Sequence, residues 1–277
     1  MTFDLLTIIG LFASTSIGIS LGLIGGGGSI LTVPVLVYLF NVDPVLATAY
    51  SLFIVGLSSL VGTFPKYKAG MIDLKTAIVF GIPSIIAVFL TRKVLVPAIP
   101  DTLFSVGDLP FTKALAMMLL FAILMVAASV SMIKDQKKEE LDNTAPRVFN
   151  YPMILLEGSV VGVLTGLVGA GGGFLIIPAL VMLSKLPMKQ AVGTSLLIIA
   201  AKSLIGFMGD VLENSSKVDW TLLGIVTTLA IFGIFIGNQL SKKIDGAALK
   251  KGFGWFVLVM GIYIIVKELV FPGASGH

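Results

Sequence analysis

Long stretches without a charged side chain are the feature that most constrains the fold of this chain. Five examples are Leu5–Gly28, Thr76–Thr91, Ala114–Met132, Trp220–Ser241 and Gly252–Val266. A helix of roughly 20 apolar residues crosses the hydrocarbon core of a bilayer. Only 12% of the 277 residues are charged, whereas soluble domains carry about 25%. We predict an all-α polytopic membrane protein, because a β-barrel would show short alternating segments instead.

Several chemistries are excluded by what the sequence lacks. It contains no cysteine, and its one histidine is His277. Disulfides, thiolate metal sites and cysteine nucleophiles are therefore excluded, and we expect no metal and no cofactor. The net charge of +4 comes from residues in short loops, so we expect no nucleic-acid partner. The opening residues MTFDLL lack the positive region of a signal peptide, so the first helix is expected to be retained.

The chain repeats itself after 144 residues. GLIGGGGSILTVP at 22–34 returns as GLVGAGGGFLIIP at 166–178, and 17 of the 41 positions from 22 to 62 match without a gap. The matches include Gly, Pro and Ser positions, which a biased membrane alphabet does not explain. This pattern predicts an internal duplication.

Each copy contains about five hydrophobic segments. They cover 4–24, 29–40, 44–64, 73–92 and 112–133 in the first copy, and 151–168, 173–184, 188–208, 219–240 and 251–271 in the second. The polar stretch 134–150 between the copies has no apolar periodicity. We therefore expect a first repeat at 1–133, a cytoplasmic linker at 134–150 and a second repeat at 151–277.

The loop charges predict how the segments cross. If every segment crosses, one side receives most of the lysines and arginines, in 65–75, 134–150, 184–189 and 241–251. The other side receives Arg92, Lys93, Lys217 and Lys267, with Lys113 near its edge. The positive-inside rule then places both termini outside the cytoplasm of a cell-membrane protein. Five crossings per copy would invert the copies relative to each other, as in secondary transporters with alternating access. A re-entrant short segment would overturn this assignment.

The glycine runs mark a short helix in each copy. Ser29–Phe40 would be roughly 18 Å long and cannot span the core, so its glycine end should lie at depth. At its other end, Asp43 and Pro44 suit the N-cap and first position of the next helix. The free N–H groups of a helix start favour an anion. The predicted anion-binding residues here are Gly25, Gly26, Gly27, Gly28, Ser29, Gly169, Ala170, Gly171, Gly172 and Gly173.

Close helix packing is the alternative role for these glycines. Gly18 and Gly22, and again Gly162 and Gly166, have the four-residue spacing of tight helix contacts. The runs could extend such faces. A phosphate-binding loop fits poorly, because no Gly-Lys-Ser/Thr follows either run.

Four further polar residues are candidates for the same site. Lys202 lies inside a hydrophobic segment, where a charge costs about 2.5–3.5 kcal/mol, and its counterpart in the first copy is Ser58. It could bind the anion or snorkel to the outer boundary. Ser51, Thr194 and Ser195 could donate hydrogen bonds to the anion, or bond their own backbone or a neighbouring helix.

Glu157 is a candidate proton carrier. It is an acidic residue inside a hydrophobic segment of the second copy, and its counterpart is Ala13. It lies about two turns from the predicted inner boundary, so solvation at the interface explains it equally well.

At these residues the sequence resembles the TauE/SafE family of sulfite and organosulfonate exporters. The motifs are GLIGGGGSILTVPVLV with ATAYSL in the first half, and GLVGAGGGFLIIPALV with AVGTSL in the second. The resemblance implies gradient-driven transport of sulfite, sulfoacetate or related sulfonates, with the proton as a candidate coupling ion. Ala170 interrupts the second run, and Lys202 is not part of the motif.

Competing functions remain open on the sequence. An anion channel could use the same helix ends, and small carboxylates could replace sulfonates as substrate. An enzyme is disfavoured, because no nucleophile–base set or carboxylate pair is present. A structural protein would need neither an intramembrane lysine nor two broken helices. Oligomeric state and transport direction are not predicted.

Overall fold

The computed structural model describes residues 5–106, 109–134, 151–182, 186–214, 218–241 and 246–270. The first half contains α1 (Leu5–Ile24), the 3₁₀ helix η1 (Gly25–Leu31), α2 (Thr32–Tyr38), α3 (Pro44–Lys68), α4 (Leu74–Leu90), the π-helix η2 (Thr91–Leu95), α5 (Val96–Ala98), strands β1 (Thr102–Val106) and β2 (Leu109–Thr112), and α6 (Lys113–Ile133). The second half contains α7 (Tyr151–Val168), α8 (Gly173–Met182), α9 (Met188–Asn214), α10 (Trp220–Leu240) and α11 (Gly246–Val270). Apart from Lys134, the predicted linker lies outside the described residues.

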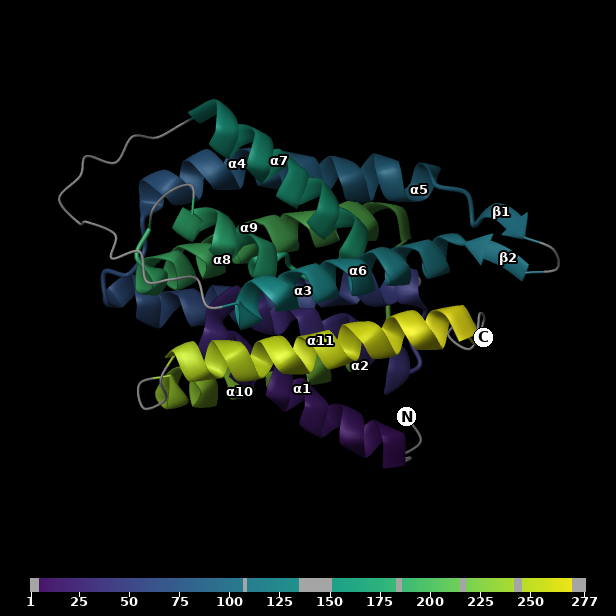
Figure 1. Cartoon of the computed structure of the whole chain (residues 1–277), viewed down its shortest axis with the longest axis horizontal. Coiled ribbons are helices and arrows are strands. Elements are labelled where there is room, and N and C mark those ends of the chain that lie inside the picture. Colours follow the sequence, from purple (N-terminus) through teal and green to yellow (C-terminus); the bar gives the residue numbers. More distant parts are fainter. Residues whose placement is uncertain are drawn as a thin grey trace.

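Most helices run along the long axis of the molecule (Figure 1). The start of α1 and the end of α11 lie at one end of the bundle, which we call the terminal end, together with the β1–β2 hairpin. The end of α6 and the start of α7 lie at the opposite end, which we call the linker end. The helices α6 and α11 pack side by side and run in opposite directions.

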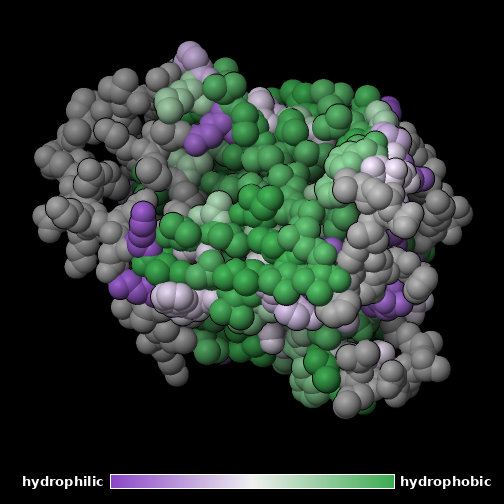
Figure 2. Space-filling model, turned by 45° about the vertical axis from the view of Figure 1, so that its right-hand side comes forward, coloured by the Kyte–Doolittle hydropathy of each residue, from purple (hydrophilic) through white to green (hydrophobic). Residues whose placement is uncertain are grey.

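The predicted all-α polytopic membrane protein is confirmed. Six helices of the described chain are long and apolar enough to cross a membrane, at Thr7–Ile24, Pro44–Lys68, Leu74–Ala98, Lys113–Val130, Lys189–Val211 and Trp220–Leu240. Large apolar side chains on α4 are exposed at every fourth position, at Ile78, Ile82 and Ile86, as expected of a lipid-facing stripe. Figure 2 shows a broad apolar surface, with hydrophilic residues gathered toward its two ends.

Glycines form two close contacts between helices of opposite halves, which we call the glycine seams. A Cβ on Gly22 of α1 would lie 2.5 Å from the carbonyl oxygen of Ile234 on α10, and Gly18 contacts Ala230 of the same helix. On the other side, a Cβ on Gly162 of α7 would lie 2.5 Å from the carbonyl oxygen of Ser84 on α4. The close packing predicted from these glycine spacings is confirmed.

The contacts between halves are reciprocal. The first helix of each half packs on the fourth helix of the other, as α1 on α10 and α7 on α4. Two pairs of equivalent helices pack on each other, as α3 on α9 and α6 on α11. A two-fold axis relating the halves would produce this pattern. The helices α3 and α9 lie at its centre and are the most buried of the six spans.

A short-range signal fixes the start of α3 as predicted. The Asp43 carboxylate accepts hydrogen bonds from the N–H groups of Val45 (2.9 Å) and Leu46 (3.1 Å), so Asp43 caps α3 with Pro44 at its first position. Asp73 caps α4 by accepting from Thr76 (2.9 Å).

Two expectations about boundaries were wrong. The first short helix begins at Gly25 rather than Ser29, because a single break at Gly25 (φ +73°) is followed at once by a tight 3₁₀ turn. The helix after 73 does not end at Arg92 but continues through the π-helix to Ala98, so Arg92 is buried rather than in a loop. The stretch before 112, for which the sequence predicted no segment, contains β1 and β2, which pair there with Phe104 stacked on Phe111.

Candidate functional site

The two glycine runs meet in the middle of the bundle. A Cβ placed on Gly26 would overlap the Cα of Gly173, and a Cβ placed on Gly173 would overlap Gly26. A Cβ on Gly171 would lie 3.4 Å from the Cβ of Ser29. Backbone therefore touches backbone across the two halves, and any bulkier residue would separate the runs.

Each run opens a half-length helix. The first breaks at Gly25 and continues as η1 and α2, whereas the second unwinds at Gly169, Gly171 and Gly172 (φ +74°, +64° and +64°) before α8 begins at Gly173. These positive φ angles are ones that only glycine adopts easily. The starts of both short helices are thus brought together, as the sequence predicted. Their roles as ligand-binding groups remain a prediction.

The central helices α3 and α9 contact the two glycine runs at equivalent positions. Gly25 packs against Val192 of α9, and Gly169 packs against Thr48 of α3. Thr48 and Val192 are separated by 144 residues, so they are counterparts in the duplication. A movement of α3 against α9 would therefore change the contacts of both glycine runs.

Lys202 reaches the second run from α9. Its side chain is fully buried, and its Nζ donates a hydrogen bond to Oγ1 of Thr165 on α7 (2.9 Å). The same Nζ lies 2.7 Å from the point where a Cβ on Gly172 would stand. Lys202 therefore points inward to the glycine runs, and the snorkelling alternative is wrong for this conformation. Its counterpart Ser58 is also fully buried.

Most of the candidate hydroxyl groups bond elsewhere. Ser29 Oγ donates to the carbonyl of Gly26 (2.7 Å), and Ser195 Oγ donates to the carbonyl of Val192 (2.9 Å). Thr194 Oγ1 accepts from the N–H of Asp73 (2.9 Å), which joins α9 to the loop before α4. Within the described chain, the fully buried Ser51 Oγ makes no hydrogen bond, so it is the candidate hydroxyl still available to a ligand.

Glu157 is not brought to the glycine runs. It lies half-buried on α7, eight residues before Thr165, which is about 12 Å along a helix. The other predicted positions at the runs, Gly27, Gly28 and Ala170, lie within them, and Gly28 packs against the backbone of Leu21.

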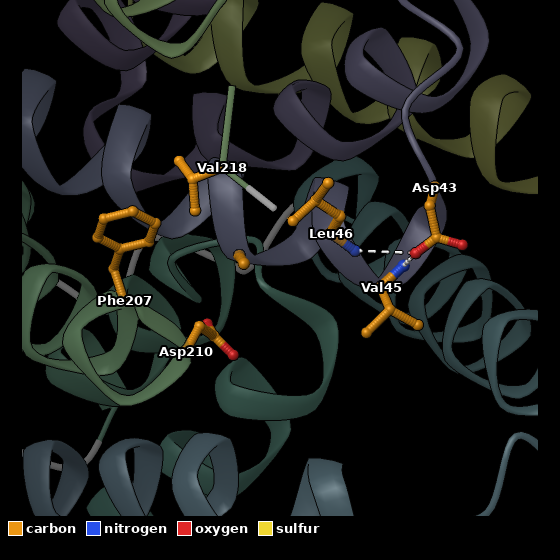
Figure 3. Close-up of a pocket in the computed structure, with 7 residues that line it drawn as sticks. Asp43, Val45, Leu46, Phe207, Asp210 and Val218 are labelled. Atoms are coloured by element: carbon orange, nitrogen blue, oxygen red, sulfur yellow. Dashed lines mark hydrogen bonds between the residues drawn. The ribbon is translucent and has the colours of Figure 1, made fainter. Parts of the chain in front are cut away.

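A pocket of about 310 Å³ opens at the terminal end of the α3–α9 contact (Figure 3). Two carboxylates and five apolar residues line it: Asp43, Val45, Leu46, Ala49, Phe207, Asp210 and Val218. Figure 3 shows Phe207 and Asp210 facing Val45 and Leu46 across this space. Ala49 is next in sequence to Thr48, which touches Gly169, so the pocket ends close to the glycine runs.

A buried ion pair stands behind this pocket, and the sequence reasoning missed it. Arg92 of η2 lies 3.5 Å from the Asp210 carboxylate, and its side chain is fully buried. Gly209 allows the approach, because a Cβ there would lie 3.2 Å from the Cβ of Arg92. Within the described residues, Asp210 is the ion-pair partner of Arg92, and the guanidinium nitrogens make no hydrogen bond.

The linker end of the α3–α9 contact is filled instead. Gly193 is the counterpart of Ala49, and a Cβ on it would overlap the carbonyl oxygen of Met71. The Asp73–Thr194 hydrogen bond lies beside this contact. Among the described residues, the loop before α4 thus occupies at the linker end the position equivalent to the one that borders the pocket at the terminal end.

No group of His, Asp and Glu suited to a metal ion occurs in the described ranges. The arrangement supplies backbone N–H groups, a buried amine and a pocket, and groups of the first two kinds favour negative charge.

Known proteins resemble this chain over nearly its whole length. The profile of the family described as "Sulfite exporter TauE/SafE" matches residues 9–264. A probable membrane transporter protein of Xylella fastidiosa (strain Temecula1) is 29% identical over 262 residues, covering 91% of this chain and 92% of that protein.

Two further relatives span a similar share. The probable membrane transporter protein MJ0441 of Methanocaldococcus jannaschii is 27% identical over 278 residues (96% of each chain), and YunE of Bacillus subtilis, also a probable membrane transporter protein, is 28% identical over 289 residues (99% of each). No solved structure gives a significant match.

Proposed function

The chain belongs to the sulfite exporter TauE/SafE family of membrane transporters, and from this premise we propose that it is a secondary transporter of small sulfur-containing oxyanions such as sulfite, sulfoacetate or other organosulfonates. One observation carries the proposal: two half-length helices from different halves begin at the same point, beside a buried lysine. Helix starts and an ammonium group both favour negative charge.

The anion would bind where the two glycine runs meet. Gly26 and Gly173 touch here, so the backbones must separate before an anion can lie between them. Three sulfonate oxygens could then take N–H groups from both runs, the Lys202 Nζ and the Ser51 hydroxyl. Small carboxylates could use the same donors, which makes them the alternative substrate class.

Alternating access is the proposed mechanism, with residues 1–133 and 151–277 as inverted halves. The reciprocal packing of the halves and the opposite directions of α6 and α11 support the inversion. The open pocket at one end of α3–α9 and the filled space at the other support a state that is open to one side only. A rocking motion of α3 against α9 would exchange the two conditions.

Loop charge supports an orientation in the cell membrane. Lys66, Lys68 and Lys75 belong to the linker end, which is therefore assigned to the cytoplasm. Both termini would then be non-cytoplasmic, and the pocket would open to the outside.

Uptake of labelled sulfoacetate and sulfite into proteoliposomes tests the proposal, with protein-free liposomes as the control. We expect saturable uptake that unlabelled sulfonates inhibit more strongly than acetate or malonate. Stronger inhibition by the carboxylates would change the substrate class. A current far above the turnover of a carrier would favour the anion channel. Absence of saturable uptake for every anion would refute the transporter proposal.

A further inference from the structure

Lys202 is buried without a charged partner. Its side chain has no exposed surface, and the ion pairs of the described residues do not include it. Its hydrogen-bond partner is Oγ1 of Thr165, which itself donates to the carbonyl of Val161 (2.6 Å). Because the Thr165 proton is already used, Oγ1 acts only as an acceptor toward Lys202. The lysine therefore has a neutral oxygen, and not a carboxylate, as its partner.

On the surrounding helices, the positions that carry ionisable residues lie toward the helix ends in sequence. The elements η1 and α8, which pack on α9, carry none. The others are Tyr50, Lys66, Tyr67 and Lys68 on α3, Lys75 on α4, Arg92 and Lys93 on η2, Tyr151 and Glu157 on α7, and Lys189, Asp210 and Glu213 on α9. Asp210, paired with Arg92, is eight residues from Lys202, or about 12 Å along α9.

This environment links the charge of the amine to the presence of an anion. An ammonium group away from water and without a counter-charge is strongly unfavourable, whereas a neutral amine hydrogen-bonded to Thr165 is tolerated. An anion at the adjacent glycine runs would supply the missing negative charge. A proton on Lys202 then raises the affinity for the anion, and the bound anion raises the affinity of Lys202 for its proton by the same factor.

Resting on the proposed function, we propose that Lys202 carries the coupling proton, so that the anion moves together with one proton. On the side of entry, the neutral amine takes a proton from water and the ammonium binds the anion. On the side of exit, the anion leaves and the ammonium returns its proton to water. The empty carrier resets with a neutral amine, and no other bond is made or broken.

The duplication restricts this role to one half of the protein. The position equivalent to Lys202 is Ser58, which cannot carry a proton in this way. One site of this kind predicts one proton per transport cycle. It also transfers the coupling role from Glu157, which the structure leaves outside the glycine centre.

Sulfoacetate uptake under a pH gradient tests the proposal, with the membrane potential clamped at zero and an internal pH dye. Sulfoacetate suits the test because its sulfonate does not titrate and its carboxyl group titrates near pH ~4. One proton per anion predicts about tenfold accumulation for an inside-alkaline gradient of one pH unit. The dye should report one proton entering for each anion.

Two variants separate binding from coupling. Lys202→Arg keeps a permanent positive charge, so it should still exchange external for internal sulfoacetate, but its accumulation ratio should fall from about ten to about one. Lys202→Gln should lose proton entry as well as most of the uptake. Exchange by Lys202→Arg also shows that this variant is folded. Glu157→Gln is the competing variant and should keep the full accumulation ratio.

Each result distinguishes the proposal from the function beneath it. Saturable wild-type uptake without proton entry would overturn the lysine coupling and leave the anion carrier intact. Accumulation that survives in Lys202→Arg, or is lost in Glu157→Gln alone, would also overturn it. Absence of uptake and exchange in the wild type would refute the transporter and the coupling together.

Discussion

The two ends of the α3–α9 contact are built from equivalent positions of the two halves, yet in the part of the chain that the structure describes one position borders a pocket and the other is filled. At the terminal end, Ala49 borders a pocket of about 310 Å³. At the linker end, its counterpart Gly193 packs against the backbone carbonyl of Met71, and Thr194 is bonded to Asp73. The same duplicated unit therefore holds its central helices in two local arrangements.

The order of the long helices is the same in the two halves and the contacts between the halves are reciprocal, so the difference between the two ends comes from local packing at Ala49 and Gly193. Between the two ends, Thr48 contacts the second glycine run at Gly169, and its counterpart Val192 contacts the first run at Gly25. A small shift of α3 against α9 would affect both contacts at once. The most direct tests therefore alter the shared centre first, and then each end in turn.

The largest effect is expected at the contact between the runs. Gly173→Val would force its side chain against the backbone of Gly26, where overpacking costs about 3 kcal/mol. We expect uptake to fall to the level of protein-free liposomes and the melting temperature to drop. The matched control is Gly224→Ala on α10, because a Cβ there has no neighbour within 4 Å. Full transport by Gly173→Val would show that the two runs need not touch.

The ion pair at the terminal end should give the next largest effect, and it should be unequal. Asp210→Asn leaves the fully buried Arg92 without its counter-charge and should cost about 3 kcal/mol of stability. Arg92→Met should cost less, because the Asp210 side chain is 19% exposed and borders the pocket. Thermal unfolding in detergent measures both. Equal losses would show that the pocket does not hydrate Asp210.

Gly193→Ala should open the filled end. A Cβ at this position would displace the Met71 carbonyl and the loop that carries it. The chain has no cysteine, so single cysteines can report access at the counterparts Leu46 and Gln190. In Gly193→Ala, a maleimide should label Gln190→Cys about tenfold faster, a change of about 1.4 kcal/mol. Labelling of Leu46→Cys should become slower. Unchanged labelling rates at both positions would show that the loop carrying Met71 does not control access to the α3–α9 contact.

The smallest effect is expected for the single hydrogen bond at that end. Thr194→Val removes the acceptor for the Asp73 N–H and should weaken the closed arrangement by about 1 kcal/mol. Labelling of Gln190→Cys should then rise about fivefold. Ser195→Ala is the control, because the Ser195 hydroxyl bonds only within its own helix, to Val192. A larger effect for Ser195→Ala would show that the closed arrangement depends on the Ser195 hydroxyl and not on that of Thr194.

Features that depend on local chemistry could be predicted from the sequence. The breaks at Gly25 and Gly169 follow from the need for positive φ, and the cap at Asp43 follows from a carboxylate placed before Pro44. Lys202 stood out because its counterpart is a serine and no charge lies near it in sequence. The meeting of the two glycine runs followed from the duplication.

Features that depend on contacts between distant segments could not be predicted. Nothing in the sequence connects Thr194 with the loop at Asp73, or Arg92 with Asp210, since each pair joins different helices. Arg92 was placed in a loop because the apolar run ends there, although no turn-forming residue follows before Pro97. The hairpin did leave a signal, because Gly107 and Asp108 separate two short runs rich in apolar residues.

The glycine seams bear on how such a chain could have arisen. The seam of α1 lies on α10 and the seam of α7 lies on α4, so each joins one half of the polypeptide to the other. A single half made alone would leave these narrow backbone faces uncovered. Under the proposed inversion of the halves, it could cover them only by pairing with an oppositely oriented copy of itself. Before the gene was fused, the ancestral unit would thus have had to insert into the membrane in both orientations.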